Sequence, residues 1–335
     1  MPSTIEPEDP AAEPVSLLPS CSSLALGLDF QIMAAHDSVL NEGIDSKTFQ
    51  LPLAKLAETL AYKAERGGGP LIKPAFVAFD IYVMVRQVLK IYEVFFYLNA
   101  DVRKLDPAWH IGFPAAVLPL VRSMIDCLYN ITTLLENPQI NGRYFRASGY
   151  KQMLDAIAED EKRYGGSKQW DDHNAERRTG VELDMRIHGF TAAEVSATPQ
   201  WLTLGRYLMR NPTATNAVFL QQLTLGFWRE YSGMSHAAFH GLIPTAPFFT
   251  PRDIPEALRP HFEIHASGML SMHLLRVVGL LLCILTEIQA HFQFDGAGIN
   301  KRLVALWGAM SPALEIKQLY DSRYAQLMSD AGITS

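Results

Sequence analysis

Apolar residues recur at intervals of three and four along most of this chain, and that spacing is the period of an α-helix. Strand-like alternation of apolar and polar residues is scarce, and no repeat of fixed period is visible. Helices with such apolar faces are stable when they pack against one another. The sequence therefore predicts an all-α fold, a multi-helix bundle with a long helical core. The expected helices cover 48–65, 74–99, 114–136, 149–164, 199–210, 213–241, 261–292, 299–310 and 312–328.

Two stretches are expected to interrupt these helices. The first helix should stop at the run Gly67 to Pro70, because three glycines and a proline disfavour a helix strongly. Residues 165–197 are polar and rich in charge, so they are predicted to form an exposed loop with at most a solvated helix. We interpret 165–197 as an insertion in one domain, and not as a second core.

The N-terminal segment differs from the rest of the chain in composition. Residues 1–20 contain five prolines and four acidic residues and no basic residue, which predicts a disordered acidic tail over about 1–24. A single helical domain should then extend over 25–330. The tail has neither the positive start nor the apolar run of a secretory signal. The three cysteines, Cys21, Cys127 and Cys283, are too far apart for a metal motif and favour a reducing compartment. We therefore expect a cytoplasmic protein.

The formal charge of -6 is concentrated at the N-terminus. Eight acidic residues precede Lys47, which is the first basic residue, and the remaining chain carries 29 basic and 27 acidic residues. The overall acidity therefore does not exclude binding of an RNA phosphate at one local site. It does argue against a broad nucleic-acid-binding face, which needs clustered basic residues.

The segment 261–292 is the most hydrophobic in the chain, which raises the question of whether it spans a membrane. Its longest stretch without a charged residue is ten residues long and lies between Arg276 and Glu287. A helix that spans a bilayer needs about 20 apolar residues. We therefore predict a buried core helix and no membrane partner.

Polar residues form a stripe on the predicted helix 213–241. Arg229 and His236 are seven residues apart, which places them within about 20° of each other around a helix. A polar stripe on a helix that is otherwise apolar must be solvated, paired or functional. Ser232 lies between them and His240 lies one turn beyond, so four polar side chains form the stripe, and Tyr231 and Ser235 are further candidates on the same segment.

A second polar ladder, Arg122, Asp126 and Asn130, lies on the predicted helix 114–136 at a spacing of four. If the two ladders face each other, Arg122, Asp126, Arg229 and His236 meet in one cavity. Arginine can then hold a phosphate with two hydrogen bonds, and histidine can transfer protons. The alternative is that both ladders are structural networks that fix the register of the helices.

Arg229 followed by six residues and His236 resembles the Arg-(x4 to 6)-His signature of the HEPN superfamily, helical bundles that include many metal-independent ribonucleases of defence and toxin systems. The layout also resembles uncharacterised bacterial helical families that carry Arg-x3-Glu/Asp and Tyr-x3-Ser-x3-His motifs. Here these motifs correspond to Arg122 with Asp126 and to Tyr231 with Ser235, while Phe239 stands at the expected histidine. In the signature Asn, Asp or His usually follows the arginine, whereas Glu230 stands at that position here. The resemblance covers at most residues 100–241.

The resemblance implies a metal-independent RNA-cleaving effector of bacterial defence or stress. His236 would act as general base or acid when a ribose 2′-hydroxyl attacks the adjacent phosphate. Arg229 would stabilise charge on the phosphoryl oxygens. Related sites commonly form across a dimer, so the resemblance also implies a homodimer.

Cofactor motifs are scarce in this sequence. His236 with His240 and His261 with His265 are spaced like zinc ligands, but neither pair has the third ligand that such a site needs. Phosphate-binding loops of the P-loop and Rossmann types are also missing, so no cofactor is expected. The alternative to an RNA-cleaving enzyme is a non-catalytic helical protein that binds a partner protein or a ligand.

Overall fold

The computed structural model describes residues 44, 47–101, 116–236, 255–296 and 298–333. The predicted tail at 1–24 lies outside these ranges. Throughout the described ranges the regular structure is helical and contains no strand, which confirms the predicted all-α fold.

The first half of the described chain forms α2 (Lys47–Leu71), α3 (Phe76–Asp101), α6 (Leu118–Glu136), α7 (Pro138–Tyr164), α8 (Lys168–Ile187), α9 (Ala192–Ala197) and α10 (Leu204–Arg210). The second half forms α11 (Ala217–Leu223), the π-helical turn η2 (Thr224–Trp228), α12 (Arg229–Ser235), the 3-10 turn η4 (Glu256–Leu258), α14 (Arg259–Phe292), α15 (Ile299–Met310), α16 (Leu314–Leu319), the π-helical turn η5 (Tyr320–Tyr324) and α17 (Ala325–Asp330).

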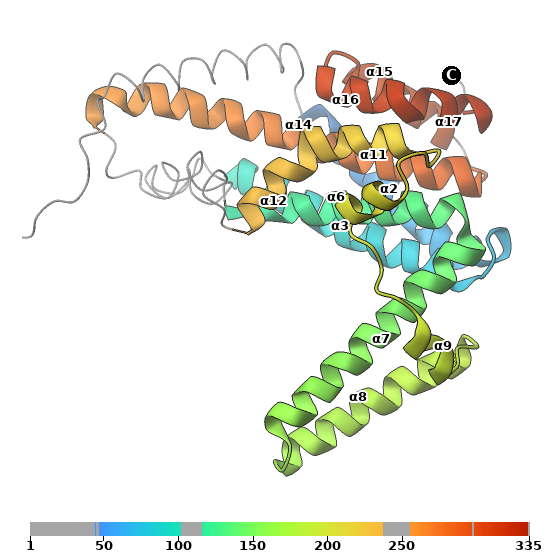
Figure 1. Ribbon diagram of the computed structural model, residues 1–335. Coiled ribbons are helices and arrows are strands. Elements are labelled where there is room, and N and C mark those ends of the chain that lie inside the picture. Colours follow the sequence, from blue (N-terminus) through green and yellow to red (C-terminus); the bar gives the residue numbers. More distant parts are fainter. Residues whose placement is uncertain (1–43, 45–46, 102–115, 237–254, 297, 334–335) are drawn as a thin grey trace, which may run out of the picture.

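Helix α14 lies at the centre of the bundle. It runs between α15 to α17 on one side and α2, α3 and α6 on the other (Figure 1). Its segment Ser271–Phe292 is long and apolar enough to cross a membrane, but 94% of its apolar window is buried inside the protein. This burial is what the core helix of a globular bundle shows, as the short charge-free stretch predicts.

The predicted end of the first helix at Gly67 is wrong, because α2 continues through the three glycines and Pro70 to Leu71. A Cβ atom on Gly68 would lie 2.9 Å from Cβ of Ala78 and 3.1 Å from the Phe292 ring. Glycine is therefore required here for close packing of α2 against α3 and α14. Tertiary contacts of this kind outweigh the low helix propensity of glycine.

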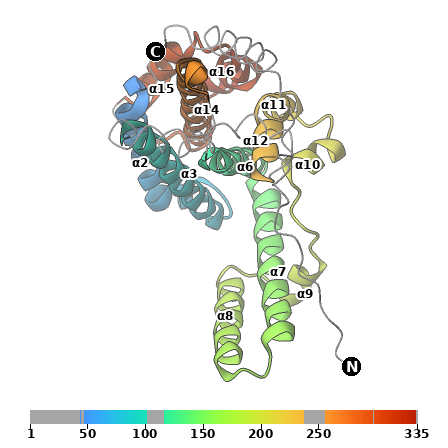
Figure 2. The ribbon, with the colours of Figure 1, turned by 90° about the vertical axis from the view of Figure 1, so that its left-hand side faces the viewer.

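The polar segment 165–197 is also more ordered than predicted. It contains the 20-residue helix α8 and the short helix α9. Helices α7 and α8 pack side by side as a hairpin that projects from the rest of the molecule (Figures 1 and 2). Most side chains of α8 are exposed, and the buried ones are Asn174, Val181 and Met185. Because α8 buries only a narrow face, most of its residues are polar, and its composition resembles that of a loop. We call the α7–α8 pair the hairpin arm.

The root of the hairpin arm is fixed to the bundle by one polar network. Arg146 donates three hydrogen bonds of 2.9–3.1 Å to the carboxylate of Asp80 on α3, and its guanidinium lies over the Phe76 ring at 4.7 Å. Arg146 also donates to the hydroxyl of Tyr150, which donates in turn to Asp184 on α8 at 2.6 Å. Both helices of the arm are thus tied to α3.

Candidate functional site

The predicted ladder on α6 forms its own ion pair. Arg122 donates from Nε to Asp126 at 3.0 Å and from Nη2 at 2.9 Å, within one helical turn. The guanidinium stacks on the indole of Trp228 at 4.1 Å, so the ladder faces η2. Burial raises the pKa of Asp126, and the neighbouring Arg122 opposes that shift. The Arg122 side chain is only 15% exposed. Arg122 and Asp126 therefore contribute to helix packing at this position.

Asn130, the third member of this ladder, has a different partner. Its Oδ1 accepts a hydrogen bond of 2.9 Å from the indole N–H of Trp201. Trp201 also packs edge-on against Phe145 of α7, at 5.1 Å between ring centroids. Asn130 therefore links α6 to the segment that precedes α10.

The predicted stripe of Arg229 and His236 lies on α12, where both side chains are exposed. In the part of the chain that the structure describes, no hydrogen bond or ion pair connects either side chain to Arg122 or Asp126. His236 is the C-cap that follows α12, and its main-chain N–H donates to the carbonyl of Ser232 at 3.1 Å. Helix α12 packs against α6, but in the described residues the two ladders are not joined by a hydrogen bond or an ion pair.

The other predicted residues of this region have separate positions. Ser232 is partly buried, and the Ser235 hydroxyl donates to the carbonyl of Tyr231 at 2.8 Å. His240 lies outside the described residues. The helix that was expected to continue to 241 is interrupted by the π-helical turn η2, and α12 ends at Ser235.

Tyr231 is fully buried and belongs to a polar cluster that helical spacing alone does not predict. Its hydroxyl lies 2.6 Å from Nδ1 of His273 on α14. Arg276, one turn further along α14, donates to Glu230 at 2.7 Å and to Glu315 of α16 at 2.8 and 2.9 Å. We call Glu230, Tyr231, His273, Arg276 and Glu315 the polar centre. It joins α12, α14 and α16.

Hydrogen bonding in the polar centre determines which ring nitrogen of His273 carries the proton. Arg276 approaches the Tyr231 hydroxyl at 3.5 Å as a donor, so the hydroxyl can accept from Arg276 and donate to His273 Nδ1. The remaining proton of a neutral imidazole then resides on Nε2, which is buried without a partner. Burial and the nearby Arg276 lower the pKa of His273 to about 3. Burial also raises the pKa of Tyr231. The imidazole of His273 is therefore neutral at pH 7, and its burial keeps it out of contact with solvent.

The sequence carries one signal for this cluster, because Arg276 lies inside the most apolar segment of the chain. A charge inside the most apolar segment of a chain requires a partner, and that requirement alone could have directed attention to Arg276.

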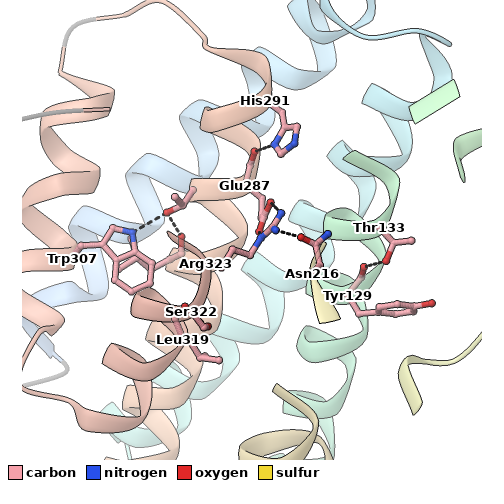
Figure 3. A network of polar contacts seen from close by, with 11 residues as sticks. Tyr129, Thr133, Asn216, Glu287, His291, Trp307, Leu319, Ser322 and Arg323 are labelled. Atoms are coloured by element: carbon pink, nitrogen blue, oxygen red, sulfur yellow. Dashed lines mark hydrogen bonds and ion pairs between the residues drawn. The ribbon is translucent and has the colours of Figure 1, made fainter. Parts of the chain in front are cut away.

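A second buried network lies further along α14, where Glu287 is completely buried. Arg323 of η5 forms an ion pair with this carboxylate, with Nη2 at 2.8 Å from Oε2, and it also donates to the side-chain oxygen of Asn216 (Figure 3). Nearby, the indole N–H of Trp307 donates to Thr286 at 3.0 Å (Figure 3). These contacts connect α14, α15 and η5 with the start of α11.

The structure also bears on the metal hypothesis. Across the described ranges, no three His, Cys, Asp or Glu side chains come close enough together to hold a metal ion. Cys127 and Cys283 are buried and free.

Comparison with known proteins identifies no relative of this chain. No protein-family model matches the chain, and no curated protein or solved structure matches it significantly.

Proposed function

We propose that this protein is a non-catalytic helical interaction protein of the cytoplasm, and that the hairpin arm binds a partner protein. The observation that supports this proposal most is that a polar network fixes an exposed helical hairpin to the bundle. The polar residues that could have formed a catalytic cluster support the same proposal, because Arg122, Asp126 and Tyr231 are occupied by contacts within the bundle.

The tip of the hairpin arm has the side chains of a protein-binding surface. Tyr164 and Trp170 stack face to face with their ring centroids 4.7 Å apart, and each is 39% exposed. Arg163 lies over the Tyr164 ring at 5.9 Å, and His173 contacts the edge of Trp170. Tryptophan, tyrosine and arginine are the residues that most often dominate binding energy at protein interfaces. The stacked rings are already ordered, so little side-chain entropy would be lost on binding.

The tip can be tested by substituting Trp170. We expect Trp170→Ala to weaken partner binding at least about tenfold, because aromatic residues at such positions carry 2 kcal/mol or more of the binding free energy. Full-length protein would be crosslinked in its native cell extract, and the recovery of one identified partner would be compared by mass spectrometry. Tyr97→Ala is the matched control, since Tyr97 is an exposed aromatic residue on α3 at 66% exposure. Equal recovery with the Trp170 and Tyr97 variants would contradict the proposed role of the arm.

The second candidate is a HEPN-like, metal-independent ribonuclease that acts as a homodimer in bacterial defence or stress. It is favoured by one observation, namely that Arg229 and His236 are both exposed and seven residues apart. This exposure leaves both side chains free to approach an RNA phosphate. Catalysis would then require proton transfer by His236 and charge stabilisation by Arg229.

A single assay separates the two candidates. Purified protein is incubated with a mixed RNA pool in EDTA, and cleavage is followed on gels. For the interaction protein, we expect no cleavage above buffer, and the variants His236→Ala and Arg229→Ala should behave like the wild type. Cleavage lost in both variants but retained in His291→Ala, an exposed histidine on α14, would instead establish the ribonuclease. Cleavage that survives all three substitutions would indicate a contaminating nuclease.

A further inference from the structure

Helix α3 carries a stripe of exposed apolar side chains on its outer face. Phe79, Val83, Val94 and Tyr97 are exposed by 53%, 47%, 38% and 66%. Their spacing places them within about 60° of one another around the helix, over a length of about 27 Å. An exposed apolar surface of this extent marks an interaction site more often than single scattered residues do.

The order of side chains in this stripe is nearly the same from either end. Val83 follows Phe79 by four residues, and Val94 precedes Tyr97 by three residues. The midpoint between Phe79 and Tyr97 is Val88. If two copies of α3 pack antiparallel about this midpoint, an aromatic ring meets a ring at each end, and a valine meets a valine next to it.

Helix α2 has an outer stripe with the same property. Leu51, Lys55, Glu58 and Tyr62 are exposed, with Leu51 at 61% and Tyr62 at 55%. They also lie within about 60° of one another around their helix. In an antiparallel pair, Leu51 of one copy meets Tyr62 of the other, and Lys55 meets the opposite charge of Glu58. The midpoint of this stripe lies between residues 56 and 57.

The two midpoints lie at the same level of the α2–α3 pair. These helices run antiparallel and pack side by side (Figure 2). Gly68 packs against Ala78 near one end, and the Tyr92 hydroxyl donates to the carbonyl of Phe49 at 3.2 Å near the other. This register places Val88 at about the level of residues 56 and 57. One two-fold axis therefore pairs both stripes at once, and an interface between identical copies requires such self-complementarity.

The charged side chains near this axis fit the same arrangement. Arg86 and Glu93 are seven residues apart, so they lie on one flank of α3, and the axis brings Arg86 of each copy toward Glu93 of the other. Lys90 already pairs with Glu93 of its own copy at 2.5 Å, and the neutral side chain of Gln87 lies opposite Lys90 across the axis. The stripes are therefore complementary in charge as well as in shape.

We propose that the outer face of α2 and α3 is the interface of a homodimer, in which a second copy packs antiparallel and the four helices form a bundle. The observation that carries this proposal is the shared centre of the two stripes. The face has no residue in common with the hairpin arm or with α12, so the dimer is independent of both proposed functions. Tyr97→Ala therefore leaves the surface of the arm unchanged.

Sedimentation velocity on the full chain over a range of concentrations gives the dissociation constant of the dimer. We expect the wild type to sediment as a dimer at micromolar concentration. Val83→Glu should raise the dissociation constant at least about tenfold, because the two-fold axis buries the new charge twice. Val218→Glu is the matched control, since Val218 is an exposed valine on α11 at 62% exposure, and it should sediment as the wild type does.

Two further variants test the register. Arg86→Glu places like charges across the axis and should weaken the dimer, whereas the double variant Arg86→Glu/Glu93→Arg restores opposite charges and should recover it. A cysteine near the axis, Gln87→Cys, should be joined to its copy by a short bismaleimide. The equally exposed Gln221→Cys on α11 should give no more crosslinked dimer than the wild type.

The proposal is overturned by any of three results. A wild type that is monomeric at tens of micromolar would mean that a different partner covers this face. Equal dissociation constants for Val83→Glu and Val218→Glu would mean that the dimer uses another face. A double charge variant that dimerises no better than Arg86→Glu, together with equal crosslinking of Gln87→Cys and Gln221→Cys, would exclude the antiparallel register. All these substitutions are at the surface, so each variant should fold.

Discussion

Replacement of Arg323 by leucine is expected to lower the free energy of unfolding by about 3–5 kcal/mol, because it leaves the carboxylate of Glu287 buried without its cation. Glu287 has no exposed surface, and Arg323 is its ion-pair partner through two hydrogen bonds. The same substitution removes the donor to Asn216. Urea unfolding followed by circular dichroism gives the free energy for the wild type and the variant.

Two comparisons identify the cause of this loss. The double variant Glu287→Leu/Arg323→Leu removes both charges, so it should be clearly more stable than Arg323→Leu alone. Lys317→Ala breaks the exposed pair of Lys317 with Asp321, and it should change stability by less than about 1 kcal/mol. If the double variant is no more stable than the single one, the loss comes from packing around Arg323 and not from an unpaired charge.

The helical class of this protein could be predicted from the sequence because the apolar period is a local property. Because periodicity is local, it also led to errors in the helix boundaries, of which two are informative. Gly68 lies inside α2 where Ala78 of the next helix and Phe292, which is distant in the chain, approach it closely. Helix α8 has the composition of a loop because it packs on α7 through a narrow face. Both features depend on contacts that local periodicity does not encode.

Residue spacing predicted the candidate site less well than the fold, because most contacts in the site join residues of different helices. Spacing along one helix places Arg122 and Asp126 four residues apart, and the structure shows that these two side chains pair with each other. The partner of Tyr231 lies 42 residues away on another helix, and Glu315 lies 39 residues from Arg276. Spacing also gave no information on which face of α12 is buried. The exposed face carries Arg229 and His236, whereas Tyr231 points into the bundle.

His273 in the polar centre should make the stability of the protein depend on pH. Its pKa is lowered to about 3 in the fold, from an ordinary value of 6.5. The unfolded chain therefore binds a proton below about pH 6.5 that the folded chain does not bind. This contribution to stability is fully present above pH 6.5 and is lost as the pH falls toward 3, at up to about 1.4 kcal/mol per pH unit. Between pH 7 and pH 5 the expected loss is about 2 kcal/mol.

The contribution of His273 can be isolated with His273→Gln, because glutamine has an amide that can pair with the Tyr231 hydroxyl and does not titrate. The charged groups around His273 are Arg276 and its two ion-pair partners, Glu230 and Glu315. They are present in both proteins, so the difference between the two pH profiles reports His273. Urea unfolding from pH 7 to pH 5 should show a smaller loss of stability in His273→Gln. Parallel profiles would mean that His273 takes up its proton equally well in the folded protein, which its 1% exposure and the nearby Arg276 argue against.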